Sequence, residues 1–295
     1  MVHQAAHQLA IDIGGTKTLA ALVKGADVAA EKQIATPRHL PAEHWCDAID
    51  DLVRDWSGRY DGAGVAVTGL VRGGVWSALN PAILPVPGGF PLEQALRRRL
   101  NVPVRALNDG QAAAWGEHRF GAGKGRDLFY LTISTGIGGG AIVDGKLLTG
   151  RHGLAGHAGQ LRLSGGEPPL RIEDMASGQW MAAEAQRAGH GGSAQAIFEA
   201  VQAGAAWADG IVQRSAGAAA LLCRNIQLLI DPGVIVIGGS VGLADGYLGR
   251  IRSLLAALPL VERPEVLASG LGKYAGVIGA ADSVRSLINA GGGKT

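Results

Sequence analysis

The chain has 295 residues, which is enough to bury a large hydrophobic core and to form two lobes. Its apolar content of 47% and charged content of 18% are typical of a soluble globular protein. The net charge of +2 comes without a basic cluster, and no apolar run approaches the roughly 20 residues that cross a bilayer, so we expect neither a nucleic-acid partner nor a membrane span.

Residues 1–120 are predicted to form a first α/β lobe. Its elements follow from apolar runs bounded by turns and from helical spacing of apolar residues. In chain order they are a strand hairpin at 9–23, a helix at 41–56, a strand at 64–69, a helix at 91–100, a strand at 104–107 and a helix at 110–118. We expect Arg97, Arg98 and Arg99 on the solvated face of their helix.

Residues 121–295 are predicted to form a second α/β lobe, with a hinge near residues 121–125. It repeats the strand hairpin of the first lobe through residue 148. The later elements are helices around 176–188, 194–201 and 205–230, a buried strand at 234–239 and a terminal helix at about 276–290. We expect the terminal helix to pack back on the first lobe. This alternation of strands and helices in two halves predicts an α/β architecture.

Both hairpins carry a glycine-rich turn, Asp12-Ile-Gly-Gly-Thr-Lys17 in the first and Ser134-Thr-Gly-Ile-Gly-Gly-Gly140 in the second. Glycine lets successive backbone N–H groups approach an anion, so both turns are candidate phosphate sites that grip one polyphosphate from two sides. The donors that we expect from the two turns are Gly14, Gly15, Thr16, Lys17, Thr135, Gly136 and Gly138. Asp12 is the expected Mg²⁺ ligand, through water; a turn-forming aspartate is the alternative.

In their order along the chain, these motifs resemble the ROK family of sugar kinases, repressors and uncharacterised proteins. The resemblance covers nearly the whole chain and also includes Asn108-Asp109, Ala155-Gly-His-Ala-Gly159, Glu173, Gly238-Gly239 and Gly279-Ala-Ala281. It implies a two-lobed fold of the actin-like, ribonuclease-H-like superfamily. It also implies ATP and Mg²⁺ as cofactors and a homodimer as the assembly.

The resemblance implies a sugar site and a catalytic base. Asp109 is the predicted base, which takes the proton of the attacking hydroxyl; a helix N-cap is the alternative reading. The sugar-contacting set that we expect is Thr68, Gly69, Asn80, Asn108, Asp109, His157, Gln160 and Glu173. Gly238 and Gly239 are expected beside the nucleotide, although a plain strand–helix turn is nearly as good an explanation. His157 has a purely structural alternative.

One departure from the family concerns zinc. Many ROK proteins bind a structural zinc with one His and three Cys. Here Gln160 stands at the position of that His, and the cysteine loop is replaced by residues 163–171, which contain no Cys. We therefore predict no zinc site, and we leave open whether Gln160 touches the sugar.

The predicted activity is ATP-dependent phosphorylation of a sugar hydroxyl. His157, where many family members have Glu, and residues 238–247 resemble the branch of the family that phosphorylates N-acetylmannosamine at its 6-hydroxyl in sialic acid catabolism. The alternative substrate is glucose or another hexose. A sugar-responsive regulator is less favoured, because only 11 residues precede Asp12. A sugar-binding protein without activity is disfavoured by the intact phosphate turns and Asp109.

The expected location is the cytoplasm. Cys46 and Cys223 have neither the spacing of a metal site nor that of a disulfide framework, as suits a reducing compartment. The first eight residues show no basic segment followed by an apolar one, so we expect no signal peptide. ATP and a small sugar are the expected partners.

Overall fold

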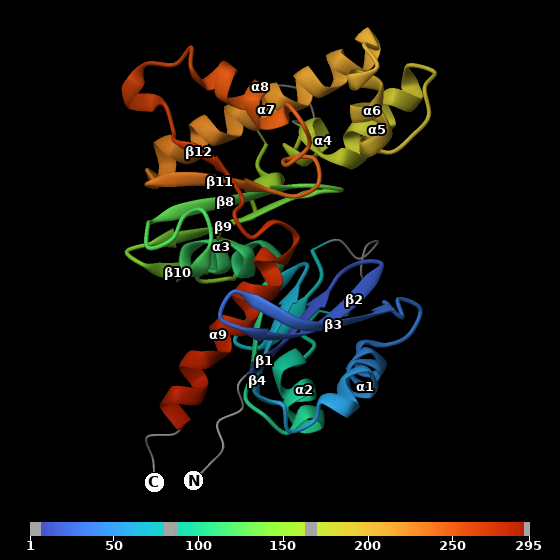
Figure 1. Ribbon diagram of the computed structural model, residues 1–295, viewed down its shortest axis with the longest axis vertical. Helices are drawn as coiled ribbons and strands as arrows, with labels where there is room; N and C mark the ends of the chain where they lie inside the picture. Colours follow the sequence, from blue (N-terminus) through green and yellow to red (C-terminus); the bar gives the residue numbers. More distant parts are fainter. Residues whose placement is uncertain (1–6, 80–85, 87, 163–169, 292–295) are drawn as a thin grey trace. The chain divides into compact units, whose positions relative to one another are not determined.

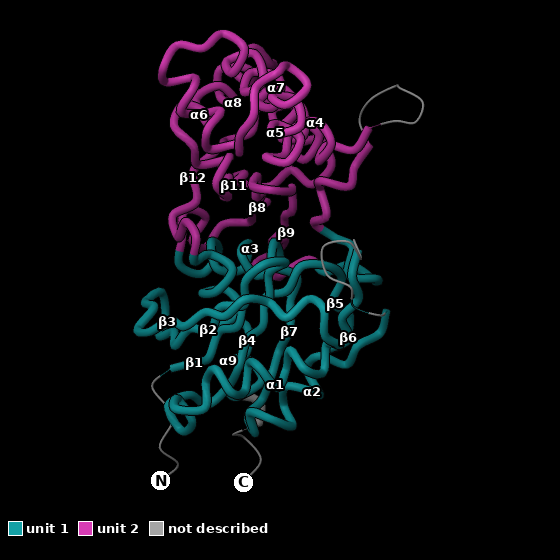
Figure 2. The backbone as a smooth tube through the Cα atoms, turned by 90° about the vertical axis from the view of Figure 1, so that its right-hand side faces the viewer, with its two compact units in different colours: residues 1–120, 149–155, 274–295 teal, residues 121–148, 156–273 magenta. Residues whose placement is uncertain are grey.

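The computed structural model describes residues 7–79, 86, 88–162 and 170–291. The chain divides into two compact units, coloured separately in Figure 2. Unit 1 comprises Met1–Phe120, Thr149–Ala155 and Tyr274–Thr295, and unit 2 comprises Gly121–Leu148 and Gly156–Lys273. Each unit has its own buried hydrophobic core.

Unit 1 is built on a five-stranded sheet with the order β3-β2-β1-β4-β7. The strands are β1 (His7–Ile13), β2 (Lys17–Lys24), β3 (Asp27–Ala35), β4 (Tyr60–Val67) and β7 (Val104–Asn108). The other elements are α1 (Ala42–Val53), η1 (Arg54–Trp56), a small hairpin of β5 (Leu70–Arg72) and β6 (Val75–Ser77), α2 (Leu92–Leu100), α3 (Asp109–Phe120) and α9 (Ala275–Gly291). Strands β1, β4 and β7 run parallel, and β2 and β3 are antiparallel to their neighbours.

The sequence of β4 explains how this sheet is covered on both faces. Ala63, Val65 and Val67 join the core that contains α1 and α2. The alternate residues Gly62 and Gly64 face α9, since a Cβ on Gly64 would lie 1.8 Å from the carbonyl oxygen of Ala280. Strand side chains alternate between faces, so large residues fill one side while the missing side chains let a helix lie close on the other.

Helix α9 also packs along α3. The two backbones touch at Gly279, where a Cβ would lie 1.8 Å from the carbonyl oxygen of Ala112, so no larger residue fits. Asp282 in α9 is buried and accepts hydrogen bonds from Trp115 Nε1 (2.9 Å) and Arg119 Nε (3.0 Å) of α3. This pairing compensates the burial of the carboxylate and fixes α3, the helix that begins at Asp109.

Unit 2 has a five-stranded sheet of the same kind, with the order β10-β9-β8-β11-β12. Its strands are β8 (Leu128–Ile133), β9 (Ile137–Val143), β10 (Lys146–Leu148), β11 (Val234–Gly238) and β12 (Val266–Ala268). Its helices are η2 (Ala158–Gln160), α4 (Glu173–Ala176), α5 (Gly178–Arg187), α6 (Ala194–Gln202), α7 (Ala206–Ile230), α8 (Tyr247–Leu255), η3 (Leu260–Glu262) and η4 (Gly272–Tyr274). Helices α7 and α8 lie on one side of this sheet (Figure 1).

The predicted strand hairpins and main helices are confirmed, and the fold is that of an α/β protein with two related sheets. Strands β3 and β12 and helix α8 were not predicted, and two further local features differ from the expectations. The β5–β6 hairpin was missed, because its strands have only three residues each. Arg99 is not on a solvated face: its side chain is 18% exposed and contacts Glu43 and Asp47 of α1, because α1 packs against α2.

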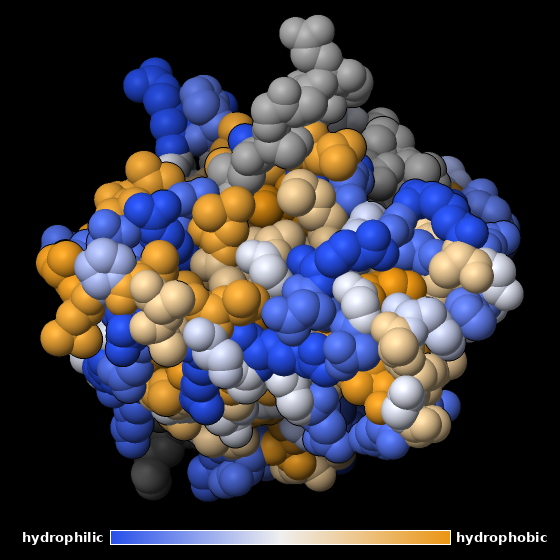
Figure 3. All heavy atoms as spheres, turned by 90° about the horizontal axis from the view of Figure 1, so that it is seen from above, coloured by the Kyte–Doolittle hydropathy of each residue, from blue (hydrophilic) through white to orange (hydrophobic). Residues whose placement is uncertain are grey.

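The surface is mixed. The large apolar side chains with the highest exposed fractions among the described residues are Leu229 at the end of α7 and Leu260 and Val261 in η3. The face drawn in Figure 3 shows apolar residues interspersed with polar ones. Within the described ranges, no helix combines the length and the apolar character that a membrane span requires.

Candidate functional site

Several of the site residues predicted in unit 1 lie at the carboxyl ends of three parallel strands. Strands β1, β4 and β7 are parallel, and Ile13 pairs with Val67, which pairs with Asn108. The carboxyl ends of the three strands therefore lie level with one another. Asp12, Gly69 and Asp109 each lie within two residues of this row. In open α/β sheets, the carboxyl ends of parallel strands are the usual place for ligands.

Asp12 and Asp109 are close enough to interact electrically. Burial, and secondarily the negative charge of Asp109, raise the pKa of Asp12 from 3.8 to about 7. Both causes disfavour the charged carboxylate. A cation at this edge would reverse the effect, because its positive charge favours two ionised carboxylates.

Asn108 performs the capping that we had considered for Asp109. Its Oδ1 accepts hydrogen bonds from the backbone N–H groups of Gly110 (3.0 Å) and Gln111 (3.2 Å) at the start of α3. Its Nδ2 donates to the carbonyl of Gly69 (3.0 Å). Asp109 Oδ1 also accepts from Gly110 N (2.8 Å). An amide nitrogen has two hydrogens, so Asn108 retains one donor beyond these contacts.

The first glycine turn is partly engaged with itself. The N–H of Gly14 donates to the carbonyl of Lys17 (3.0 Å), and its carbonyl accepts from the Thr36 hydroxyl (2.8 Å). Thr36 N–H donates to the carbonyl of Thr16 (3.0 Å). Thr16 and Lys17 are exposed, so the hydroxyl and the ammonium group of the turn face solvent. Thr36, which sequence reasoning missed, braces this turn from just beyond β3.

The second glycine turn is braced by Glu173. The Oε2 of Glu173 accepts the N–H of Ile137 (3.0 Å), and it lies so close to Gly136 that a Cβ there would be 2.7 Å away. The turn also closes on itself, because Ser134 N–H donates to the carbonyl of Gly136 (2.9 Å). The carbonyls of Ser134 and Thr135 accept N–H groups from the start of α5. Glu173 and Thr135–Gly138 therefore form one cluster in unit 2.

Arg171 connects Gln160 and Glu173. Its guanidinium makes two hydrogen bonds to Asp174 (2.7 and 2.6 Å), donates to Gln160 Oε1 (3.3 Å) and lies 3.8 Å from Glu173 Oε1. These contacts raise the pKa of Arg171 and lower that of Asp174, mainly through their hydrogen bonds to each other. Sequence reasoning missed Arg171; its position two residues before Glu173 was the available signal.

His157 precedes η2 and is half-buried. Its Nε2 atom is buried and makes no hydrogen bond to the described part of the chain, although the residue takes part in other interactions. Its place in a sugar site stays a prediction. Asn80 lies outside the described residues.

Gly238, the last residue of β11, and Gly239, which follows it, are both required by contacts within unit 2. A Cβ on Gly238 would lie 2.1 Å from the Tyr130 hydroxyl. Gly239 has φ +85°, and a Cβ there would lie 2.4 Å from the carbonyl oxygen of Ile133. The backbone turn after the strand therefore requires glycine whether or not a nucleotide passes beside it.

No group of three or more His, Cys, Asp or Glu side chains that could hold a metal occurs among the described residues. Residues 163–169, most of the segment that replaces the cysteine loop, lie outside them. The expected absence of zinc stays a prediction.

Comparisons with known proteins give a consistent result. A model of the ROK family matches residues 8–286. The bifunctional enzyme NanE/NanK of Brucella melitensis is 47% identical over 93% of this chain, and the chain spans 53% of that relative's length. The N-acetylmannosamine kinase of Escherichia coli is 40% identical over 92% of this chain and 96% of its own length. A ROK family glucokinase of Streptomyces griseus, solved with glucose and AMPPNP, has a TM-score of 0.79 and 30% identity over 95% of this chain and 99% of its own.

Proposed function

The chain belongs to the ROK family, and on that premise we propose that it is an ATP-dependent kinase for the 6-hydroxyl of N-acetylmannosamine. The substrate assignment rests on the Escherichia coli relative, which is named for this activity and matches over 96% of its length. The chain spans about half the length of the Brucella relative, so the proposal concerns the kinase activity.

The observation that carries the kinase chemistry is the pair of carboxylates in unit 1. Asp12 is the penultimate residue of β1 and Asp109 directly follows β7, a parallel strand of the same sheet. Burial, and secondarily the charge of Asp109, raise the pKa of Asp12. Phosphoryl transfer needs a group that positions metal and phosphate and a group that accepts the hydroxyl proton. Asn108 caps the start of α3, so Asp109 is not needed as the helix cap. The two carboxylates can therefore divide these two roles between them.

Asp109 is the proposed general base. Its carboxylate takes the proton of the sugar hydroxyl while the hydroxyl oxygen forms a bond to the γ-phosphorus and the bond to the β-phosphate oxygen breaks, yielding sugar phosphate and ADP. Helix α3 orients Asp109, and Asp282 of α9 holds α3 through Trp115 and Arg119. His157, Glu173 and the free hydrogen of Asn108 Nδ2 are proposed to bind sugar hydroxyls.

The residues around both turns fit a nucleotide and its metal. Thr16 and Lys17 are exposed donors, and Asp12 has the carboxylate that Mg²⁺ prefers. Mg²⁺, when bound, neutralises phosphate charge and stabilises the ionised form of Asp12. The second turn, braced by Glu173, offers further backbone donors at Gly136 and Gly138. We propose Gly238 and Gly239 as the backbone beside the nucleoside.

A coupled ADP-release assay tests the proposal. Mg-ATP is combined with N-acetylmannosamine, N-acetylglucosamine, mannose, glucose or fructose. The highest kcat/KM is expected for N-acetylmannosamine. A preference for glucose would keep the kinase but replace its substrate, in line with the 30% identity to the Streptomyces glucokinase. No turnover on any sugar would contradict the kinase proposal.

A cytoplasmic homodimer is the proposed state of the protein, and it rests on the family resemblance and on the two cysteines, which are both free and buried. Light scattering on the purified chain is expected to give twice the monomer mass of 30.2 kDa. A mass that stays at 30.2 kDa across the working concentration range would remove the dimer.

A further inference from the structure

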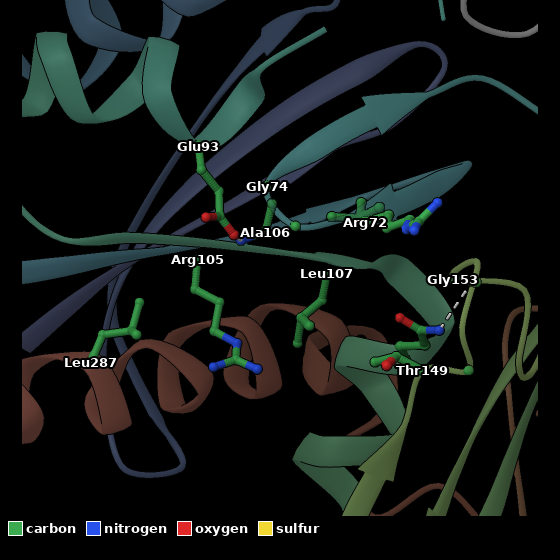
Figure 4. Close-up of a pocket in the computed structure, with 13 residues that line it drawn as sticks. Arg72, Gly74, Glu93, Arg105, Ala106, Leu107, Thr149, Gly153 and Leu287 are labelled. Atoms are coloured by element: carbon green, nitrogen blue, oxygen red, sulfur yellow. Dashed lines mark hydrogen bonds between the residues drawn. The ribbon is translucent and has the colours of Figure 1, made fainter. Parts of the chain in front are cut away.

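Unit 1 contains a cavity of about 300 Å³ that no proposed role has used (Figure 4). It lies against β7, the last strand in the order of its sheet, and against the turn between β5 and β6. Thr149 and Gly153 of a second segment close it, together with Leu287 of α9. None of the lining residues belongs to the predicted catalytic or nucleotide-binding sets.

The cavity is cationic. Arg72 and Arg105 line it, and neither guanidinium has an ion pair or hydrogen bond to the residues that the structure describes. Arg105 is half-buried and Arg72 is exposed at the rim. The one acidic lining residue, Glu93, is already occupied: Oε1 accepts the N–H of Ala106 (2.8 Å) and Oε2 lies 3.9 Å from Arg97.

Figure 4 shows that Glu93 and Arg105 lie on opposite sides of β7. The side chains of Arg105 and Leu107 leave β7 on the same side, whereas Glu93 approaches Ala106 from the other. The Glu93 carboxylate therefore accepts a backbone N–H from the outer edge of β7, the last strand of its sheet, and does not pair with Arg105. An unpaired guanidinium in a half-buried position favours an anionic ligand, because its planar fork can hold two oxygens of a phosphate or carboxylate.

Gln111 adds a neutral polar group to the wall. Its side chain is 1% exposed, and Nε2 is held by the carbonyls of Ala155 (3.0 Å) and Gly153 (3.5 Å). These bonds orient the amide, and no hydrogen bond of Oε1 to the described residues accompanies them. A fixed amide oxygen accepts a hydrogen bond from a hydroxyl. Thr149 supplies a second hydroxyl-binding group on the same wall.

We propose that this cavity binds a sugar phosphate, with the phosphate on Arg105 and the sugar hydroxyls toward Gln111 and Thr149. A cavity of about 300 Å³ is at the small end of ligand pockets, as suits one hexose phosphate. The proposal rests on the proposed function, whose product is a ligand of this class.

Isothermal titration with N-acetylmannosamine 6-phosphate at constant ionic strength tests the proposal. ADP and whichever sugar is turned over best are kept saturating, so that the catalytic site is blocked. Wild type should bind one equivalent. Arg105→Gln should weaken binding about tenfold or more, since it removes the charge-assisted contact to the phosphate. Arg72→Gln should weaken binding less, because Arg72 is exposed at the rim. Arg59→Gln is the matched control, because Arg59 is exposed in unit 1 and does not line the cavity.

Three results would overturn the site. They are no binding to the blocked wild type, equal weakening by Arg59→Gln, and binding unchanged in both cavity variants. Inorganic phosphate bound as tightly as the sugar phosphate would reject the sugar as part of the ligand. If no sugar is turned over at all, the proposed function fails on its own assay. The comparison of Arg105→Gln with Arg59→Gln then still decides whether the cavity binds the sugar phosphate.

Discussion

The two sheets of this protein have one plan and different chemistry. In both, a central strand pairs with an antiparallel hairpin partner on one side and with a parallel strand on the other, and that parallel strand pairs in turn with a second one. Each hairpin ends in a glycine turn. Counted from the turns, Asp12 of β1 corresponds to Thr132 of β8, because each belongs to the second residue pair from its turn.

Asp12 and Asp109 have no acidic counterparts at the matching positions of unit 2. Asp109 follows β7, whereas β12 is followed by Ser269, Gly270 and Leu271. Unit 2 instead braces its turn with Glu173, whose Oε2 is occupied by Ile137 N–H. The difference indicates that a repeated scaffold supplies two glycine turns, while the proposed metal ligand and the proposed base are both in unit 1.

The division predicts that loss of Asp109 has the largest effect. Asp109→Asn should lower kcat by roughly 10²- to 10⁴-fold, the usual contribution of a general base. Sugar affinity, measured by calorimetry, should change little. Asp61→Asn is the control, since Asp61 is in β4 of the same sheet but near its amino end. Turnover above about a tenth of wild type in Asp109→Asn would remove Asp109 as the base.

Asp12→Asn should raise the stability of the protein while lowering its activity. The pKa of Asp12 is raised from 3.8 to about 7, so the folded protein holds a proton that the unfolded chain releases. Stability of the ligand-free wild type should therefore fall as pH rises from about 4 to 7 and then level off. Because Asn cannot ionise, the variant should gain on the order of 4 kcal/mol of folding stability over the wild type at pH 8, while it loses Mg²⁺-dependent turnover.

Urea denaturation at pH 4 and pH 8 measures this effect. The variant's gain in stability should be small at pH 4, because Asp12 in the folded wild type is then protonated and as neutral as Asn. The gain should be complete at pH 8. An advantage of equal size at both pH values would show that ionisation of Asp12 is not its cause. A variant that is less stable than wild type at pH 8 would contradict the burial argument.

Gly239→Ala probes the corresponding end of unit 2 and should cost about 1–3 kcal/mol or more. The residue has φ +85°, and its new Cβ would lie 2.4 Å from the Ile133 carbonyl oxygen. Gly58→Ala is the control, because Gly58 has φ +79° but nothing within 4 Å of its Cβ. Equal loss of stability in the two variants would mean that only backbone conformation matters, and that close approach to β8 does not.

The outcome shows which features a sequence can predict. The two hairpins with glycine turns, together with α1, α7 and β11, follow from local patterns of apolar residues and glycine, so they were predictable. The cap on α3 was not assigned to Asn108, because adjacent Asn and Asp are equally good caps. The ion pairs of Arg99 and the bracing of the first turn by Thr36 were not predictable either. They join segments brought together only by the sheet.

The smallest effect is expected from metal removal. By the family resemblance, Gln160 is expected at the position of a zinc-binding histidine. Its Oε1 accepts a hydrogen bond from Arg171, which is itself paired with Asp174. The positively charged guanidinium of Arg171 therefore lies beside the position of the expected zinc ligand, where it would repel a metal ion. EDTA should leave the melting temperature unchanged. Arg171→Met should cost less than about 1 kcal/mol, since the pair is partly exposed. One zinc per chain by elemental analysis, or a lower melting temperature in EDTA, would contradict this account.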